Sequence, residues 1–176
     1  FNKRERVLRT LDMEEPDRVP ITEIDIEATL LENITGKKFP ATASLQTQVI
    51  ADRKLEKKRN DLRIECYKKV GFDVLIVDLS APEGWKPAVN PDGTMVDLWG
   101  RVLMLDKQTK TWVPYNTIFN SPEDFEDFEL PDPTAPGWTF ATKHSKKVAG
   151  NSMALATFIR DPFAQAWEMF TPTKFA

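Results

Sequence analysis

A continuous apolar run at residues 72–78, FDVLIVD, constrains the fold more than any other feature of the sequence. It ends in the carboxylate of Asp78 and has the pattern of a parallel strand that is buried on both faces. Gly71 precedes it, where glycine can adopt the left-handed conformation that terminates a helix. A long helix is expected before that glycine, over about residues 44–70, because its apolar positions share one stripe: Leu55, Leu62, Cys66 and Val70. Helix, glycine and buried strand together form one α/β unit.

Two further runs predict strands of the same sheet. Residues 19–26 are rich in β-branched side chains, and residues 152–159 form another apolar run. Because helices separate these strands along the chain, we expect all three to lie parallel, joined by right-handed crossovers. The expected helices cover residues 2–13, residues 138–149 and a segment that begins at Asp161.

Residues 94–118 interrupt this alternation, because their apolar and β-branched stretches are typical of a β-hairpin. A short helix should follow at Ser121, which is a good N-cap residue and precedes a proline and two acids. A complete (β/α)8 barrel needs about 250 residues, whereas this chain has 176 residues and supplies three β/α units. We therefore expect the α/β class: about the first half of a TIM barrel, in a single domain over residues 1–176, with the hairpin as an excursion.

Composition excludes several classes of function. The formal net charge is -3 and 41% of the residues are hydrophobic, so neither a nucleic acid nor a membrane surface is expected as the main partner. Cys66 and His144 are the single cysteine and the single histidine, which excludes an intrachain disulfide and most self-contained metal sites. The start of the chain is charged, unlike a secretory signal, so we expect a cytoplasmic protein.

Several motifs occur in an order that is found in one enzyme superfamily. They are RERVL at residues 4–8, EEPDRVPI at 14–21, GFD at 71–73, DLWGR at 97–101, SPED at 121–124 and LPDP at 130–133. With this ordered set, the chain resembles the N-terminal part of the uroporphyrinogen decarboxylase superfamily over nearly its whole length. The resemblance implies a (β/α)8 barrel that is completed by residues beyond 176, so the present segment alone should be inactive.

The superfamily has two main chemistries. Its decarboxylases remove carboxylates from porphyrinogen acetates without a cofactor, and they grip the substrate with an arginine-bearing segment after the first strand. Here that segment, residues 22–27, has no arginine but three carboxylates, Glu23, Asp25 and Glu27. At about 4 Å and an effective dielectric constant near 20, each like-charge contact with an acidic substrate costs on the order of 4 kcal/mol. The resemblance therefore favours the methyltransferase branch, which exchanges a methyl group between a small substrate and a corrinoid protein.

Thiol-methylating members of that branch resemble one another in a zinc site that is built from a His-x-Cys pair and a distant cysteine. Zinc there creates a thiolate nucleophile. Neither Cys66 nor His144 matches this pattern, so we expect no metal bound by this segment, and any zinc ligands would lie beyond residue 176. The corrinoid would be carried by a partner protein.

The candidate site residues follow from the strand ends, because the active site of a barrel lies at the carboxyl ends of its strands. Asp78 closes the second strand and resembles an aspartate that binds pyrrole N–H groups in the decarboxylases. Glu23 and Asp25 lie two residues apart and should share one face of the first strand. Asp78 and Glu23 are the candidate catalytic residues. The candidate substrate-binding residues are Asp25, Trp85, Trp99 and Arg160.

Each assignment has a structural alternative. Asp78 could bond to a loop or cap a helix, and the pair of Glu23 and Asp25 could form salt bridges with neighbouring elements. Tryptophans on a hairpin often pack as a small core. Three further features are interpreted as structural: the charged stretch 52–61 as a solvated helix face, Cys66 as core and His144 as a solvent-facing helix residue.

Three functions remain open at this point. The first is a corrinoid-dependent methyltransferase that acts on a small methylated substrate, and the second is a uroporphyrinogen decarboxylase of porphyrin biosynthesis. The third is a non-catalytic α/β binding domain, whose open sheet edge would have to be covered. An enzyme should carry polar residues in a pocket at its strand ends, whereas a binding domain need not.

Overall fold

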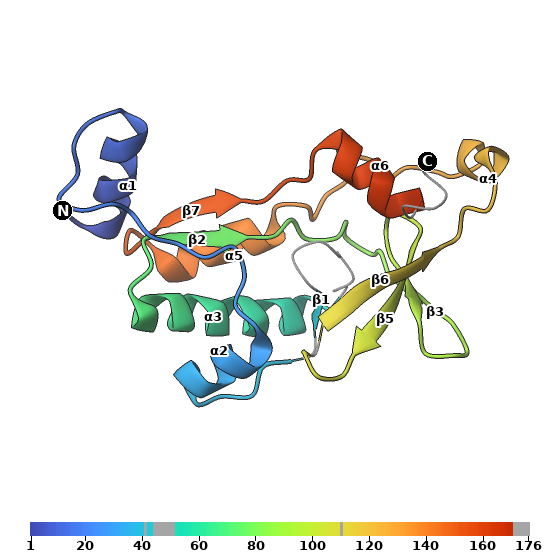
Figure 1. Ribbon diagram of the computed structural model, residues 1–176, viewed down its shortest axis with the longest axis horizontal. Helices are drawn as coiled ribbons and strands as arrows, with labels where there is room; N and C mark the ends of the chain where they lie inside the picture. The colour runs from blue at the N-terminus through green and yellow to red at the C-terminus, as the bar shows by residue number, and fades with distance from the viewer. Residues whose placement is uncertain (41, 44–51, 110, 171–176) are drawn as a thin grey trace. The chain divides into compact units, whose positions relative to one another are not determined.

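The computed structural model describes residues 1–40, 42–43, 52–109 and 111–170 (Figure 1). The fold is mixed α/β, with one parallel sheet and one mostly antiparallel sheet, and neither sheet is closed into a barrel over these residues. The chain divides into two compact units. The first consists of Phe1–Pro40, Asp52–Leu79 and Thr139–Phe158, and the second of Ala41–Ala51, Ser80–Trp138 and Ile159–Ala176.

The first unit is a two-stranded parallel sheet packed against helices. β2 (Val74–Val77) pairs in parallel with β7 (Ala154–Thr157). α3 (Arg53–Val70) and α5 (Phe140–Ala149) pack on this sheet and on each other, as Figure 1 shows. The other helices of the unit are α1 (Lys3–Leu11), which contacts both strands, and α2 (Ala28–Thr35), which packs on α3.

The caps of α3 explain how this helix leads the chain into β2. The carboxylate of Asp52 accepts hydrogen bonds from two amides of the first turn, at 2.8 and 3.3 Å. Gly71 ends the helix in the left-handed conformation, with φ at 94°. The predicted unit of helix, glycine and strand is therefore confirmed from Arg53 onward, and residues 44–51 of the predicted helix lie outside the described residues.

β2 is buried on one face only. Leu75 and Val77 are 2% and 1% exposed, and they pack in one core with side chains of α3 and α5. Val74 and Ile76, which point the other way, are half-buried. The prediction of a strand buried on both faces was therefore wrong for the described chain, because both helices that pack on the sheet contribute to the same core.

The predicted first strand at residues 19–26 is not a strand. It runs beside β2 through single contacts: the Asp73 amide donates to the Ile21 carbonyl at 2.8 Å, and the Thr22 hydroxyl donates to the Val74 carbonyl at 2.7 Å. These contacts do not continue as a ladder, and Ile21 stays 47% exposed. Of the three predicted parallel strands, two are confirmed in one sheet and the first was wrong.

The second unit is built on a five-stranded sheet in the order β1-β6-β5-β4-β3. At its centre, β5 (Arg101–Asp106) and β6 (Thr111–Thr117) form an antiparallel pair, which confirms the hairpin that was predicted within residues 94–118 and outside the parallel sheet. Leu103 of β5 is fully buried against partly buried neighbours. The remaining elements are β1 (Thr42–Ala43), β3 (Ala88–Val89), β4 (Met95–Val96), α4 (Pro122–Glu126) and α6 (Pro162–Phe170).

Candidate functional site

Two aspartates flank β2, Asp73 directly before its first residue and Asp78 directly after its last. They are 0% and 9% exposed, and each forms ion pairs with two arginines. In α/β proteins, polar groups outside the carboxyl ends of parallel strands are typical of ligand sites, whereas those at the opposite ends are typical of stabilising contacts. The two aspartates differ in whether their hydrogen-bonding capacity is filled.

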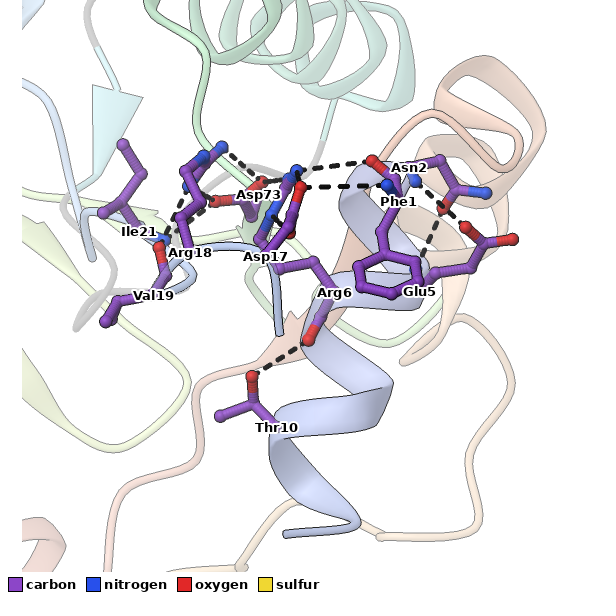
Figure 2. Close-up of polar contacts among 10 residues, drawn as sticks. All are labelled: Phe1, Asn2, Glu5, Arg6, Thr10, Asp17, Arg18, Val19, Ile21 and Asp73. Carbon is purple, nitrogen blue, oxygen red and sulfur yellow. Dashed lines mark hydrogen bonds and ion pairs between the residues drawn. The ribbon is translucent and has the colours of Figure 1, made fainter. Parts of the chain in front are cut away.

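The contacts of Asp73 fill both of its carboxylate oxygens (Figure 2). Arg6 Nη1 donates to Oδ1 at 2.7 Å, and Arg18 donates to Oδ2 at 2.7 Å and to Oδ1 at 3.0 Å. The amide of Ile21 donates a further hydrogen bond at 2.9 Å. Arg6 in turn binds both oxygens of Asp17 at 2.7 Å. This cluster ties α1 and the segment after it to the beginning of β2.

The pKa values in this cluster indicate carboxylates that stay charged. Burial alone would raise the pKa of Asp73, but the hydrogen bonds from Arg18, the Ile21 amide and Arg6 outweigh it and hold that pKa below its usual value. The pKa of Asp17 falls to about 2, chiefly because Arg6 donates to its carboxylate. A filled and charged network of this kind anchors a fold and leaves no atom for a ligand.

The contacts of Asp78 leave one oxygen and two donors unused. Its Oδ2 lies 2.8 Å from Arg59 Nη2 and 3.4 Å from Arg63 Nη1, and both arginines come from α3. Around Asp78, three buried atoms have no hydrogen-bond partner in the described chain: Asp78 Oδ1, Arg59 Nε and Arg63 Nε. A buried polar group without a partner costs about 1–3 kcal/mol. The carboxyl end of β2 therefore carries buried polar groups whose hydrogen-bonding capacity the described chain does not fill.

The segment before α2 adds a second carboxylate to this cluster. Asp25 Oδ1 lies 4.0 Å from Arg63 Nη2, which also donates to the carbonyl of Ile24 at 3.4 Å. The Tyr67 hydroxyl donates to the carbonyl of Glu23 at 2.7 Å, and burial raises the pKa of Tyr67, so the phenol keeps its proton. Burial alone would lower the pKa of Arg63, but Asp78 and Asp25 outweigh it and raise that pKa, so the guanidinium stays charged.

The strand-end cluster, which we define as Asp25, Arg59, Arg63 and Asp78, can bind a polar molecule in two ways. Asp78 Oδ1 can accept a hydrogen bond from an N–H or O–H group, and the two Nε atoms can donate to an oxygen. The two carboxylates offset the charge of the two guanidiniums, so the cluster suits a polar or weakly anionic group. Because two arginines hold the Asp78 carboxylate in a fixed position, this carboxylate is suited to orient a substrate.

The predicted site residues divide between the two units. Asp25 and Asp78 come together around Arg63, with which both form ion pairs. The Glu23 side chain is exposed and accepts a hydrogen bond from the neighbouring Ile24 amide at 2.9 Å. The prediction that Glu23 and Asp25 share a strand face was wrong, because their segment is not a strand. The other candidates, Trp85, Trp99 and Arg160, belong to the second unit.

In the second unit, the DLWGR motif forms a tight turn with a structural role. The Asp97 carboxylate accepts hydrogen bonds from the amides of Trp99 and Arg101, both at 2.9 Å, and from Arg101 Nε at 2.6 Å. Arg101 Nη1 continues to Glu168 of α6 at 2.7 Å, and Glu168 also pairs with Arg160. Trp99 is half-buried in this turn, and Arg160 belongs to the same ion-pair network. The motif therefore connects β5 to α6 within the unit.

Arg59 and Arg63 are the site residues that the sequence reading missed. The stretch 52–61 was interpreted as a solvated helix face, which was wrong for three of its residues: Glu56, Arg59 and Asn60 are 4%, 6% and 4% exposed. A signal was present, since Arg59, Arg63 and Tyr67 recur at spacings of four and so share one face of α3. Apolar periodicity does not detect a polar stripe that faces a strand end.

Cys66 and His144 do not take part in the strand-end cluster. Cys66 is fully buried, which confirms its assignment to the core, and burial raises the pKa of its thiol. His144 is not simply solvent-facing, because its Nε2 lies 2.7 Å from Asp61 Oδ1 and its side chain is 16% exposed. In the part of the chain that the structure describes, no three His, Cys, Asp or Glu side chains are grouped closely enough to hold a metal ion.

Comparisons with known proteins found no match. No family model matches its sequence, no curated protein matches it, and no solved structure matches its fold. Among the described residues, no helix combines the length and the apolar character needed to cross a membrane.

Proposed function

We propose that this chain is the N-terminal part of a (β/α)8-barrel enzyme similar to the uroporphyrinogen decarboxylase superfamily, with its active site at the strand-end cluster. The observation that carries the proposal is the buried Asp78 carboxylate, which follows a parallel strand and keeps one oxygen without a partner. The half-buried outer face of β2 supports a larger sheet in the complete enzyme.

We propose further that the enzyme is a methyltransferase that acts on a small methylated substrate with a corrinoid carried by a partner protein. In this reaction the strand-end cluster binds and orients the substrate. Asp78 Oδ1 accepts a hydrogen bond from it, and Asp25, which is half exposed, contributes a second carboxylate. Orientation matters because methyl transfer requires in-line approach, and small misplacements of the reacting atoms are costly.

The corrinoid, when bound, supplies the cobalt centre that carries the methyl group. The described residues do not fit a zinc site of the thiol-methylating type, because the one cysteine is buried in the core and the one histidine is paired with Asp61. Zinc in this enzyme would therefore need ligands beyond residue 176. The remaining part of the barrel would supply them.

Uroporphyrinogen decarboxylation is the second candidate, and one observation favours it. The absence of arginine at residues 22–27 argued against an acidic substrate, but α3 brings Arg59 and Arg63 to the same strand end. Guanidinium groups bind carboxylates well. Asp25 and Asp78 offset their charge, so the cluster is less basic than a site for a polyacid requires, and methyl transfer remains the primary proposal.

A paired assay of the complete enzyme separates the two candidates. One arm follows the cobalamin absorbance with methyl ethers, methanol and methylamines, and the other follows the formation of coproporphyrinogen. We expect methyl transfer, and an Asp78→Asn variant should reduce its kcat/KM by about 10²-fold through lost orientation. Asp12→Asn, an exposed matched change in the first unit, should leave the rate unchanged. Robust coproporphyrinogen formation would refute the methyltransferase proposal.

A further inference from the structure

A groove of about 640 Å³ lies in the first unit, along the outer face of α3. One wall comes from the segment after α2 and the other from the first half of α3. Its floor includes Leu62, which is 5% exposed and belongs to the core beneath. The walls carry five lysines, Lys37, Lys38, Lys54, Lys57 and Lys58. We call this feature the lysine groove.

The acids near the lysine groove are already engaged. Glu65 pairs with Lys37 at 2.5 Å and with Lys69 at 3.1 Å, and Asp61 binds His144 at 2.7 Å. On the outer wall, Lys38 pairs with Glu32 at 3.3 Å. The lysines of α3 are thus left with an excess of positive charge.

Three lysines of the groove have no carboxylate within ion-pair distance in the described chain: Lys54, Lys57 and Lys58. Lys54 lies in the first turn of α3, where the helix dipole disfavours cations, and Lys57 and Lys58 lie in the second turn. Lys57 also lies over the ring of Phe140 in α5, with its Nζ 5.5 Å from the ring centroid. The whole chain has a formal net charge of -3, so an excess of positive charge here is local. Positive charge at a helix N-terminus, against the preference of the helix dipole, is typical of a functional surface.

The second unit contains a segment with the opposite, negative charge. Residues 123–132 contain six acids and no basic residue, and every one of the six is exposed. In the described chain, none of the six forms an ion pair. The segment includes the short helix α4, and its acids are Glu123, Asp124, Glu126, Asp127, Glu129 and Asp132. We call it the acidic segment.

We propose that the lysine groove of one copy of this chain binds the acidic segment of a second copy. Lysines are point charges on flexible stems, so they suit carboxylates spread along a segment, whereas a single phosphate is better held by arginine forks. No aromatic side chain lines the described walls of the groove, so nucleic-acid bases have no surface on which to stack. Because each copy carries both patches, the contact can close as a reciprocal pair of copies or extend from copy to copy.

Sedimentation equilibrium of the full chain tests this proposal. At about 0.05 M salt, the weight-average mass should rise with protein concentration above the monomer mass of 20.1 kDa, and it should return to the monomer at about 0.5 M salt because screening weakens exposed charge pairs. A monomer at every concentration and salt would overturn the proposal. A contact between the lysine groove and the acidic segment of the same copy would also give the monomer mass at every concentration, and would therefore overturn the proposal as well.

Charge-reversed variants make the test specific. Lys54→Glu/Lys58→Glu and Glu126→Lys/Glu129→Lys should each weaken self-association at least about tenfold, which corresponds to 1.4 kcal/mol. Mixed in equal amounts, the two variants should associate again, because each supplies the charge that the other lost. Lys86→Glu/Lys107→Glu, which reverses two exposed lysines elsewhere, should behave as the wild type. Failure of the mixture to associate while both variants remain folded by circular dichroism would refute the interface.

Discussion

The two ends of β2 hold the same kind of cluster in two different states. Directly before the strand, Asp73 binds Arg6 and Arg18 with both oxygens in use. Directly after the strand, Asp78 binds Arg59 and Arg63 through one oxygen only, and its other oxygen has no partner in the described chain. Burial is nearly equal at both ends, so burial does not distinguish them.

Whether the buried polar atoms have hydrogen-bond partners, more than their charge or burial, distinguishes a cluster that anchors the fold from a candidate binding site. A filled buried network stabilises the folded state, whereas a buried group that lacks a partner destabilises it until a ligand arrives. The residues of the filled end come from the N-terminal segment, and those of the open end come from α3.

Asp73→Asn should be the most destabilising single change in either cluster. The substitution removes the one carboxylate that pairs with Arg18 in the described chain. It also removes one of the two carboxylates that pair with Arg6. Breaking a buried ion pair by removal of one partner costs about 3–5 kcal/mol. Denaturant unfolding, followed by far-UV circular dichroism, should show this loss in the free energy of unfolding. A loss no larger than that of Asp12→Asn would contradict the anchoring role.

Asp78→Asn should destabilise the fold less than Asp73→Asn. Asp78 has two charged contacts, and the one to Arg63 is long at 3.4 Å. Loss of a hydrogen bond between charged groups costs about 1.5–3 kcal/mol. The same unfolding experiment measures it, and the ratio of the two losses is the quantity of interest. Equal losses at both ends would remove the distinction between anchor and site.

Low pH should weaken the cluster of Asp17, Arg6 and Asp73 before the first residue of β2. The pKa of Asp17 is about 2 in the folded chain, against an ordinary value of 3.8. Because the folded pKa is the lower one, this carboxylate stabilises the fold above about pH 4, and that contribution is lost as the pH falls toward 2. Unfolding midpoints between pH 5 and pH 2 should therefore fall less steeply for Asp17→Asn than for the wild type. Parallel curves for the two proteins would refute the pairing with Arg6 in solution.

Asp25→Asn should change stability least. Its carboxylate is 41% exposed and lies 4.0 Å from Arg63, a contact that water screens. Exposed pairs of this kind contribute about 0–1 kcal/mol. Thermal unfolding of the variant should match the wild type closely, whereas substrate affinity of the complete enzyme should fall if Asp25 contacts the substrate. Unchanged affinity would remove Asp25 from the proposed site and leave Asp78 in place.

Elements whose signals are local can be predicted from the amino-acid sequence alone. The pairing of Asn2 with Glu5 predicts the start of α1, and both hydrogen bonds of that capping box are present. Ser121 caps the short helix α4, and Gly71 separates α3 from β2. The hairpin and the third predicted strand also follow from short-range patterns. These features depend on residues within a few positions of one another, so a linear reading contains their physical cause.

Contacts between polar residues that are distant in the sequence depend on the folded arrangement of the chain. Asp73 binds Arg6 across 67 residues and Arg18 across 55, and neither spacing leaves a trace in periodicity. In α1 the buried residue is Arg6, which no apolar pattern identifies. The segment at 19–26 has strand-like composition but lacks a continuous ladder, because strand formation depends on a partner backbone as much as on propensity.

The same reason explains the candidate site. Asp78 was identifiable, because an aspartate that directly follows an apolar run marks a strand end. Its partners were not, because Arg59 and Arg63 lie in a helix rich in exposed charge and only packing turns them inward. A charged side chain is buried when another element supplies its counter-charge, and that condition is set by the fold rather than by the neighbouring sequence.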